Sequence, residues 1–138
     1  MTIYLDASVL LRRVLGQPGT LAEWAAIRYT VASALTETEC LRTLDRLRVR
    51  GVLGADDLAV RRESALRLLS SVEVVQPTRA ILTRASEPMP TALGTLDAIH
   101  LATALLWRER QGTELVMATH DAALGTASRV FGLQVVGL

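Results

Sequence analysis

Four acidic side chains, far apart in the chain, are the residues that could do chemistry together: Asp6, Glu39, Asp97 and Asp121. Carboxylate oxygens are the ligands that hard divalent cations such as Mg²⁺ prefer. Two carboxylates about 4 Å apart repel by about 4 kcal/mol at an effective dielectric near 20, so a pocket of four would take up protons or bind a cation. The pattern therefore indicates metal-dependent chemistry on phosphate groups.

The sequence also predicts where these acids meet. Asp6 and Asp121 follow short apolar runs, and Glu39 and Asp97 lie in the first turn or two of strongly helical segments. In an open parallel sheet the carboxyl ends of the strands share one edge, and ligands bind there. We therefore expect one pocket at that edge. Zinc is not expected, because the chain has one cysteine and two histidines.

The elements that position these acids alternate along the chain. Short β-rich runs are separated by segments in which leucines recur at helical spacing. Such alternation predicts an α/β sandwich of three layers, with a central, mainly parallel sheet of about five strands covered on both faces. The expected strands are Thr2–Leu5, Tyr29–Ser33, Val72–Val75, Leu115–Ala118 and Leu133–Val136, and the expected helices are Ser8–Leu15, Leu21–Ile27, Ala34–Val49, Asp56–Leu69, Pro77–Ala85, Thr95–Arg110 and Asp121–Val130.

Composition indicates one ordered domain over residues 1–138, of which half are apolar. The single cysteine, Cys40, excludes an intramolecular disulfide framework. The start of the chain has no basic leader, and no apolar run approaches the roughly 18 residues of a membrane helix. We therefore expect a cytoplasmic protein without membrane contact. All fifteen basic residues are arginine, whose planar fork suits phosphate groups, although compositional bias of the genome is the simpler explanation.

Each acid alone also has a purely structural interpretation. Asp6 and Asp121 stand where a helix N-cap would contribute about 1 kcal/mol. Asp97 in a first helical turn gains roughly 0.3–1 kcal/mol from the helix dipole. Glu39 could be a solvated helix residue, like Glu37. The joint pattern favours the site, because independent caps need not fall on one edge of one sheet.

Four segments give the chain a resemblance to a known family. They read IYLDASVLL, VASALTETECLRTL, LGTLDAIHLATAL and VMATHDAAL, and together they span the domain in order. The chain resembles PIN-domain ribonucleases, and more narrowly the VapC toxins of bacterial type II toxin–antitoxin systems. The resemblance implies a PIN-like fold over residues 1–138 and a catalytic pocket in which the four acids bind one or two Mg²⁺ or Mn²⁺ ions. It also selects Glu39 over Glu37.

The resemblance further implies an activity and its partners. The activity is endoribonucleolytic hydrolysis of RNA phosphodiester bonds by a metal-activated water, and the partners are an RNA substrate, a cognate antitoxin and a second copy of the chain. Ser8 and Thr119 match hydroxyl positions near the pocket; either they orient a carboxylate, or Ser8 caps a helix and Thr119 ends a strand. Arg42, one turn from Glu39, is the first candidate for contact with the RNA backbone.

Some positions depart from the family pattern or have other interpretations. Many relatives carry another acid or asparagine where this chain has Ala122 to Leu124, so a second metal would bind more weakly. His100 is expected to be a packed histidine of the core, and His120 a loop histidine without a role. Trp24 and Trp107 are expected to be core or interface anchors, and the leucine-rich helices from residue 21 to 69 are where a partner groove is expected.

Two other functional classes remain open. A Mg²⁺-dependent phosphatase or phosphoacceptor domain also places an aspartate after its first strand. That chemistry usually needs a second acid where this chain has Ser8, and a lysine, of which there is none. A catalytically inactive PIN-like binding module is the other alternative, and retention of all four acids argues against it.

Overall fold

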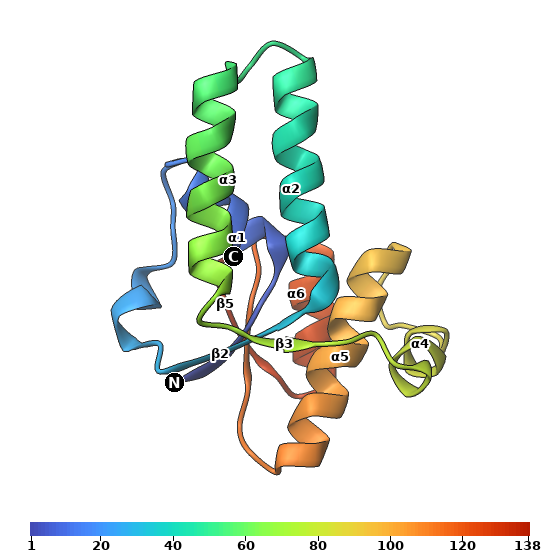
Figure 1. Ribbon diagram of the computed structural model, residues 1–138. Helices are drawn as coiled ribbons and strands as arrows, with labels where there is room; N and C mark the ends of the chain where they lie inside the picture. Colours follow the sequence, from blue (N-terminus) through green and yellow to red (C-terminus); the bar gives the residue numbers. More distant parts are fainter.

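The computed structural model describes residues 1–138 as a central sheet between two layers of helices (Figure 1). All five strands are parallel, in the order β3-β2-β1-β4-β5. Their bounds are β1 Thr2–Leu5, β2 Tyr29–Ser33, β3 Glu73–Val75, β4 Val116–Ala118 and β5 Gln134–Val136. The predicted α/β sandwich with a five-stranded parallel sheet is thus confirmed.

Six α-helices and one short 3₁₀ helix connect the strands, close to the predicted positions. The segment predicted as a helix over Leu21–Ile27 is the 3₁₀ turn. The helix predicted to start at Pro77 instead starts at Arg79, because the Thr78 hydroxyl accepts a hydrogen bond from the Ile81 N–H and caps it. The bounds are α1 Ala7–Val14, η1 Ala22–Ala26, α2 Ala34–Val49, α3 Ala55–Leu69, α4 Arg79–Ala85, α5 Thr95–Gln111 and α6 Ala122–Val130.

Alternation along β1 divides the core between the two faces of the sheet. Ile3 and Leu5 belong to the apolar cluster that α1, α2 and α3 cover, whereas Tyr4 belongs to the cluster under α5 and α6. All three side chains are buried. Because β1 is covered on both faces, its carboxyl end is rigidly positioned, and the residue that follows it, Asp6, inherits that position.

The register of the sheet brings the ends of β1, β2 and β4 to one level. Leu5 pairs with Ala118 and Tyr4 pairs with Val31, and the Asp6 N–H continues the ladder by donating to the Ala118 carbonyl at 3.1 Å. The chain enters α1, α2 and α6 directly beyond these strands. Residues at the starts of those helices therefore share one edge of the sheet.

The helices α2 and α3 form an antiparallel pair that extends beyond the sheet (Figure 1). Gly51 in the connecting turn has φ +74°, a conformation that favours glycine. Near the far end of the pair Val49, Val52 and Val60 are mostly exposed. No helix in the molecule combines the length and the apolar character needed to cross a bilayer.

Candidate active site

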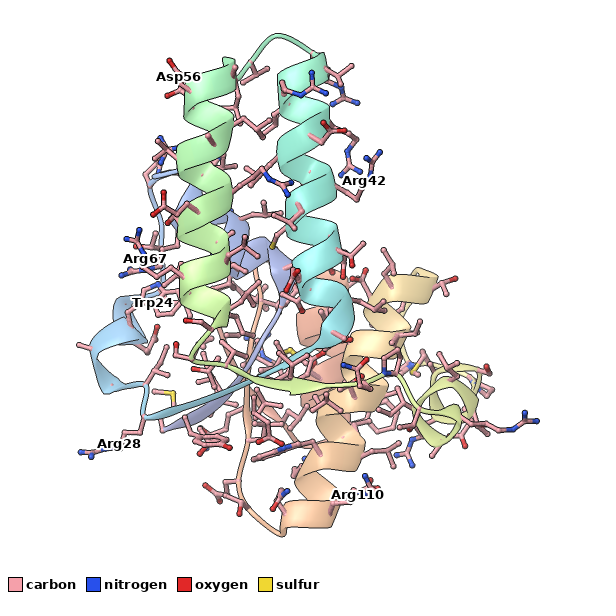
Figure 2. The ribbon with its side chains drawn as sticks, viewed as in Figure 1. Trp24, Arg28, Arg42, Asp56, Arg67 and Arg110 are labelled. Atoms are coloured by element: carbon pink, nitrogen blue, oxygen red, sulfur yellow. The ribbon has the colours of Figure 1, made fainter.

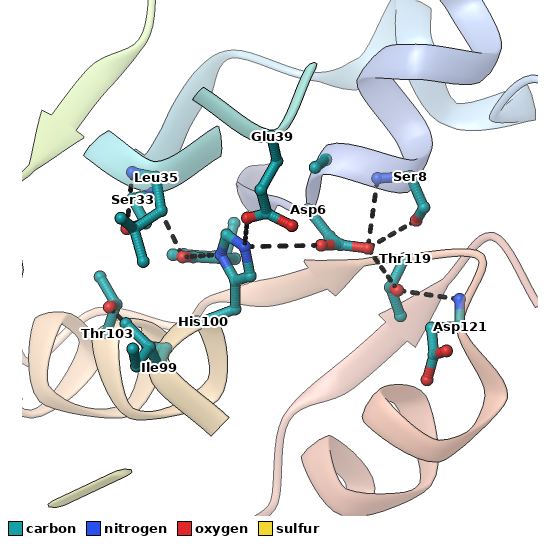
Figure 3. A network of polar contacts seen from close by, with 12 residues as sticks. Asp6, Ser8, Ser33, Leu35, Glu39, Ile99, His100, Thr103, Thr119 and Asp121 are labelled. Carbon is teal, nitrogen blue, oxygen red and sulfur yellow. Dashed lines mark hydrogen bonds and ion pairs between the residues drawn. The ribbon is translucent and has the colours of Figure 1, made fainter. Parts of the chain in front are cut away.

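Asp6 is held by hydroxyl groups from two distant parts of the chain. Its Oδ2 accepts hydrogen bonds from the Ser8 hydroxyl at 2.5 Å, the Ser8 N–H at 3.4 Å and the Thr119 hydroxyl at 2.9 Å (Figure 3). Asp6 is 4% exposed, and its Oδ1 faces His100 Nε2 at 4.0 Å. One carboxylate oxygen is therefore fixed by the protein, while the other is directed toward the neighbouring ionisable side chains.

Ser8 and Thr119 also connect Asp6 to the segment after β4. The Ser8 hydroxyl accepts from the His120 N–H at 3.0 Å, and the Thr119 hydroxyl accepts from the Asp121 N–H at 3.0 Å. Thr119 is fully buried. Of the alternatives left open by the sequence, the contacts of both hydroxyls correspond to orientation of a carboxylate, and the residue that caps α1 is Asp6 rather than Ser8.

Glu39 approaches Asp6 from α2. Its Oε1 lies 2.5 Å from His100 Nε2, and its side chain is 23% exposed. Glu37, two residues earlier, is exposed and has no contact with His100 or Asp6. The helical offset between positions two apart, about 200°, explains why only one of the two glutamates can face the sheet edge.

His100 joins Glu39 to the core. It is fully buried, and its Nδ1 lies 2.8 Å from the Tyr4 hydroxyl, which accepts a hydrogen bond from the Ser33 N–H at 3.2 Å. Burial, followed by the charge of Asp6, raises the pKa of Tyr4, so the phenol keeps its proton. When His100 is neutral, the phenol donates to Nδ1 and the His100 Nε2–H donates to Glu39; when His100 is protonated, both of its ring nitrogens are donors.

The sequence predicted a packed histidine at His100, which its burial bears out, but not its contact with the acids. The sequence feature that could have predicted this contact is the position of His100 one helical turn after Asp97. Burial opposes protonation of His100; the hydrogen bond to Glu39 and the charges of Asp6, Glu39 and Asp97 outweigh it and raise the pKa. His120, by contrast, contacts the Gly137 carbonyl through Nδ1 at 2.5 Å.

Asp97 and Asp121 complete the acidic neighbourhood. Asp97 is half-buried in the first turn of α5, and its pKa is raised by desolvation, then by the charges of Asp121, Asp6 and Glu39. Asp121 is exposed and caps α6, since its Oδ1 accepts from the Leu124 N–H at 2.7 Å. The helix-cap interpretation and the site interpretation are therefore compatible for both Asp6 and Asp121.

The four carboxylates are the type of ligand that a hard divalent cation prefers, although they lie farther apart than the ligands of a bound metal ion do. No three histidine, cysteine, aspartate or glutamate side chains lie at the mutual spacing of a metal centre. The available donors are all carboxylate oxygens, including Asp6 Oδ1 and an oxygen of Asp97. Desolvation, and after it the repulsion between these carboxylates, raises the pKa of Asp97. A bound Mg²⁺ or Mn²⁺ would relieve that repulsion.

The arginines of α1, α2 and α3 have different surroundings. Arg42 projects from α2 on the side away from α3 (Figure 2) and forms an ion pair with Asp45 at 3.2 Å. Arg61 donates to the Val14 carbonyl at 2.7 Å and Arg13 lies over the ring of Trp24 at 4.6 Å. Arg61 and Arg13 thus support the packing around α1, whereas Arg42 lies on the surface one turn from Glu39.

Comparison with known proteins gives consistent matches over nearly the whole chain. The sequence model of the PIN domain matches residues 3–127. Ribonuclease VapC46 of Mycobacterium tuberculosis H37Rv is 30% identical over 138 residues, which cover 97% of this chain and 95% of that protein.

Solved structures match the fold at lower identity. A toxin–antitoxin complex from Klebsiella pneumoniae contains a chain with a TM-score of 0.65 at 18% identity, covering 91% of this chain and 90% of the other. The VapBC-1 structure from nontypeable Haemophilus influenzae gives a TM-score of 0.61 at 19% identity, covering 98% and 96% of the two chains.

Proposed function

Since the chain belongs to the PIN-domain family, we propose that it is a Mg²⁺- or Mn²⁺-dependent endoribonuclease and the toxin of a type II toxin–antitoxin module. The names of its relatives, which are ribonucleases of the VapC group, support the reaction class. The observation on which the proposal depends is the meeting of Asp6, Glu39 and His100 at the sheet edge, with Asp97 within the electrostatic influence of Asp6, Glu39 and Asp121.

In this proposal four acidic side chains bind the cation, and two hydroxyl groups orient one of these acids. Asp6, Glu39, Asp97 and Asp121 hold the cation, which when bound supplies activation of water and stabilisation of charge on the scissile phosphate. The hydroxyls of Ser8 and Thr119 keep Asp6 in one rotamer. No side chain is needed as a covalent nucleophile, and the arginines of α2 hold the RNA backbone.

His100 has a positioning role in the same proposal. Its Nε2 fixes one oxygen of Glu39, and Tyr4 fixes the opposite ring nitrogen, so the glutamate is oriented from within the core. The carboxylate has its second oxygen left for the cation. His100 itself is fully buried and does not reach the substrate.

A protein partner belongs to the proposal as well. The complexes among the structural relatives support an antitoxin that binds this domain and blocks the acidic pocket. A homodimer is the proposed assembly of the free toxin. Size-exclusion chromatography with light scattering, with and without a co-expressed antitoxin, would measure both assemblies directly.

The function is tested by RNA cleavage with purified protein. Wild type should cleave single-stranded RNA in millimolar Mg²⁺ or Mn²⁺, and EDTA should stop the reaction. Asp97→Asn should abolish cleavage, whereas the matched control Glu37→Gln, an exposed acid on the same helix as Glu39, should retain it. Cleavage that survives EDTA, or an Asp97→Asn variant as active as wild type, would contradict the proposal.

A further inference from the structure

A groove opens beside Glu39, between α2 and the start of α5. It encloses about 280 Å³, and its lining includes Thr38, Glu39, Arg42, Thr43, Arg46 and Leu96. Glu39, Thr43 and Arg46 are spaced by four and three residues, so they follow one face of α2 away from the acidic site. The groove is therefore continuous with the proposed active site and leads from it along the helix.

The arginines on this part of α2 differ in how their charges are compensated. Asp45 forms ion pairs with both Arg42, at 3.2 Å, and Arg48, at 2.9 Å. Arg46 has no carboxylate partner; its guanidinium donates to the Thr43 hydroxyl at 2.9 Å. Arg46 therefore contributes a positive charge to the groove that the protein itself leaves unpaired.

The walls of the groove suit a phosphate group better than a base. Arg46 offers a planar fork of N–H donors, and the Thr43 hydroxyl, which accepts from Arg46, still has its own proton to donate. No aromatic side chain lines the groove, so it has no platform on which a base could stack. Charge and hydrogen-bonding capacity both match a phosphodiester oxygen.

We propose that Arg46 and Thr43 bind a backbone phosphate of the RNA adjacent to the scissile one, and that the strand runs outward along α2. The inference rests on the proposed ribonuclease function. Seven residues of helix separate Glu39 from Arg46, about 10 Å along the axis, so the phosphate held there is a neighbour of the one being cut. Arg46, rather than Arg42, is then the principal contact, because Arg42 shares the Asp45 carboxylate with Arg48, whereas Arg46 has no acidic partner.

The test measures RNA affinity as a function of salt in a variant that binds without cutting. A fluorescein-labelled single-stranded oligoribonucleotide of mixed sequence is titrated with the full-length Asp97→Asn protein, and anisotropy is followed over a series of NaCl concentrations. Arg46→Ala in this background should weaken binding and lower the slope of log K against log[salt] by about 0.7, the value for one phosphate contact on a single strand. Arg48→Ala is the matched control, since Arg48 is paired with Asp45 and does not line the groove.

Further variants test the chemistry of the contact. Arg46→Lys should keep the salt slope while losing affinity, because a lysine retains the charge without the fork. In the wild-type background Arg46→Ala should raise KM and leave kcat unchanged, as expected for lost ground-state binding. Since Arg46 is exposed, the melting temperature should not change.

The outcomes separate this inference from the function on which it rests. If the wild type cleaves RNA and the salt slopes of Arg46→Ala and Arg48→Ala are equal, Arg46 is not a phosphate contact although the ribonuclease proposal stands. If the wild type neither binds nor cleaves RNA, both proposals fail. If Arg46→Ala leaves RNA binding intact but abolishes binding of polyglutamate, the groove receives an acidic protein segment and the inference is wrong.

Discussion

Replacing Thr119 by valine removes the hydroxyl that joins Asp6 to Asp121 while keeping the shape of the side chain. Thr119 is fully buried, so valine fills the same space without creating a cavity. The change deletes a hydrogen bond to a carboxylate, which contributes about 2 kcal/mol, and leaves the Asp121 N–H without its acceptor, which costs about 1 kcal/mol more. We therefore expect the free energy of unfolding to fall by about 3 kcal/mol. The Ser8 hydroxyl still donates to Asp6, but it cannot also replace the hydrogen bond that Thr119 donated.

Urea denaturation followed by circular dichroism measures this loss. Ser128→Ala is the matched control: that hydroxyl is equally buried but bonds only the Leu124 carbonyl of its own helix. The control should lose less than about 1 kcal/mol, the usual contribution of a neutral hydrogen bond. If Thr119→Val and Ser128→Ala are destabilised equally, the connection between Asp6 and Asp121 has no special strength and our account of the site geometry is wrong.

Two further predictions concern the ionisable residues of the site. Asp97 has a raised pKa in the folded protein, so its ionisation costs stability as pH rises above the range where it titrates in the unfolded chain. Asp97→Asn should therefore raise the melting temperature at pH 7 in EDTA, and millimolar Mg²⁺ should raise that of the wild type more than that of the variant; equal metal shifts would contradict the metal role of Asp97. His100 also has a raised pKa, so its contribution is full below its unfolded pKa and is lost as pH rises through the folded value. Unfolding free energies measured from pH 5 to pH 9 should show this loss in wild type and not in His100→Gln; identical profiles would refute it.

Local patterns in the sequence were sufficient to predict where the strands and helices of the fold lie. The bounds of β1, β2 and α2 agree with the prediction, because uninterrupted apolar runs and leucine spacing define them without reference to the rest of the molecule. The 3₁₀ turn at Ala22–Ala26 was predicted as an ordinary helix. A segment this short has few internal hydrogen bonds, so its packing decides between the two forms.

The contacts of the site could be predicted only in part. The expectation that the acids lie near one edge of the sheet followed from the rule that parallel strands end there. The link from Tyr4 through His100 to Glu39 did not, because it depends on a β1 side chain that points to one face of the sheet and meets a histidine from another layer. The pairing of Arg42 with Asp45 was equally hidden, since side-chain rotamers decide it.

The bonds from Thr119 to Asp6 and from His120 to Ser8 join residues more than a hundred positions apart. During synthesis, the ribosome must therefore complete β4 before the first aspartate acquires its fixed orientation. A nascent polypeptide that has emerged only as far as α5 has neither of these anchors. Under the proposed ribonuclease function, the site around Asp6 would therefore be assembled only when translation of the domain is nearly finished.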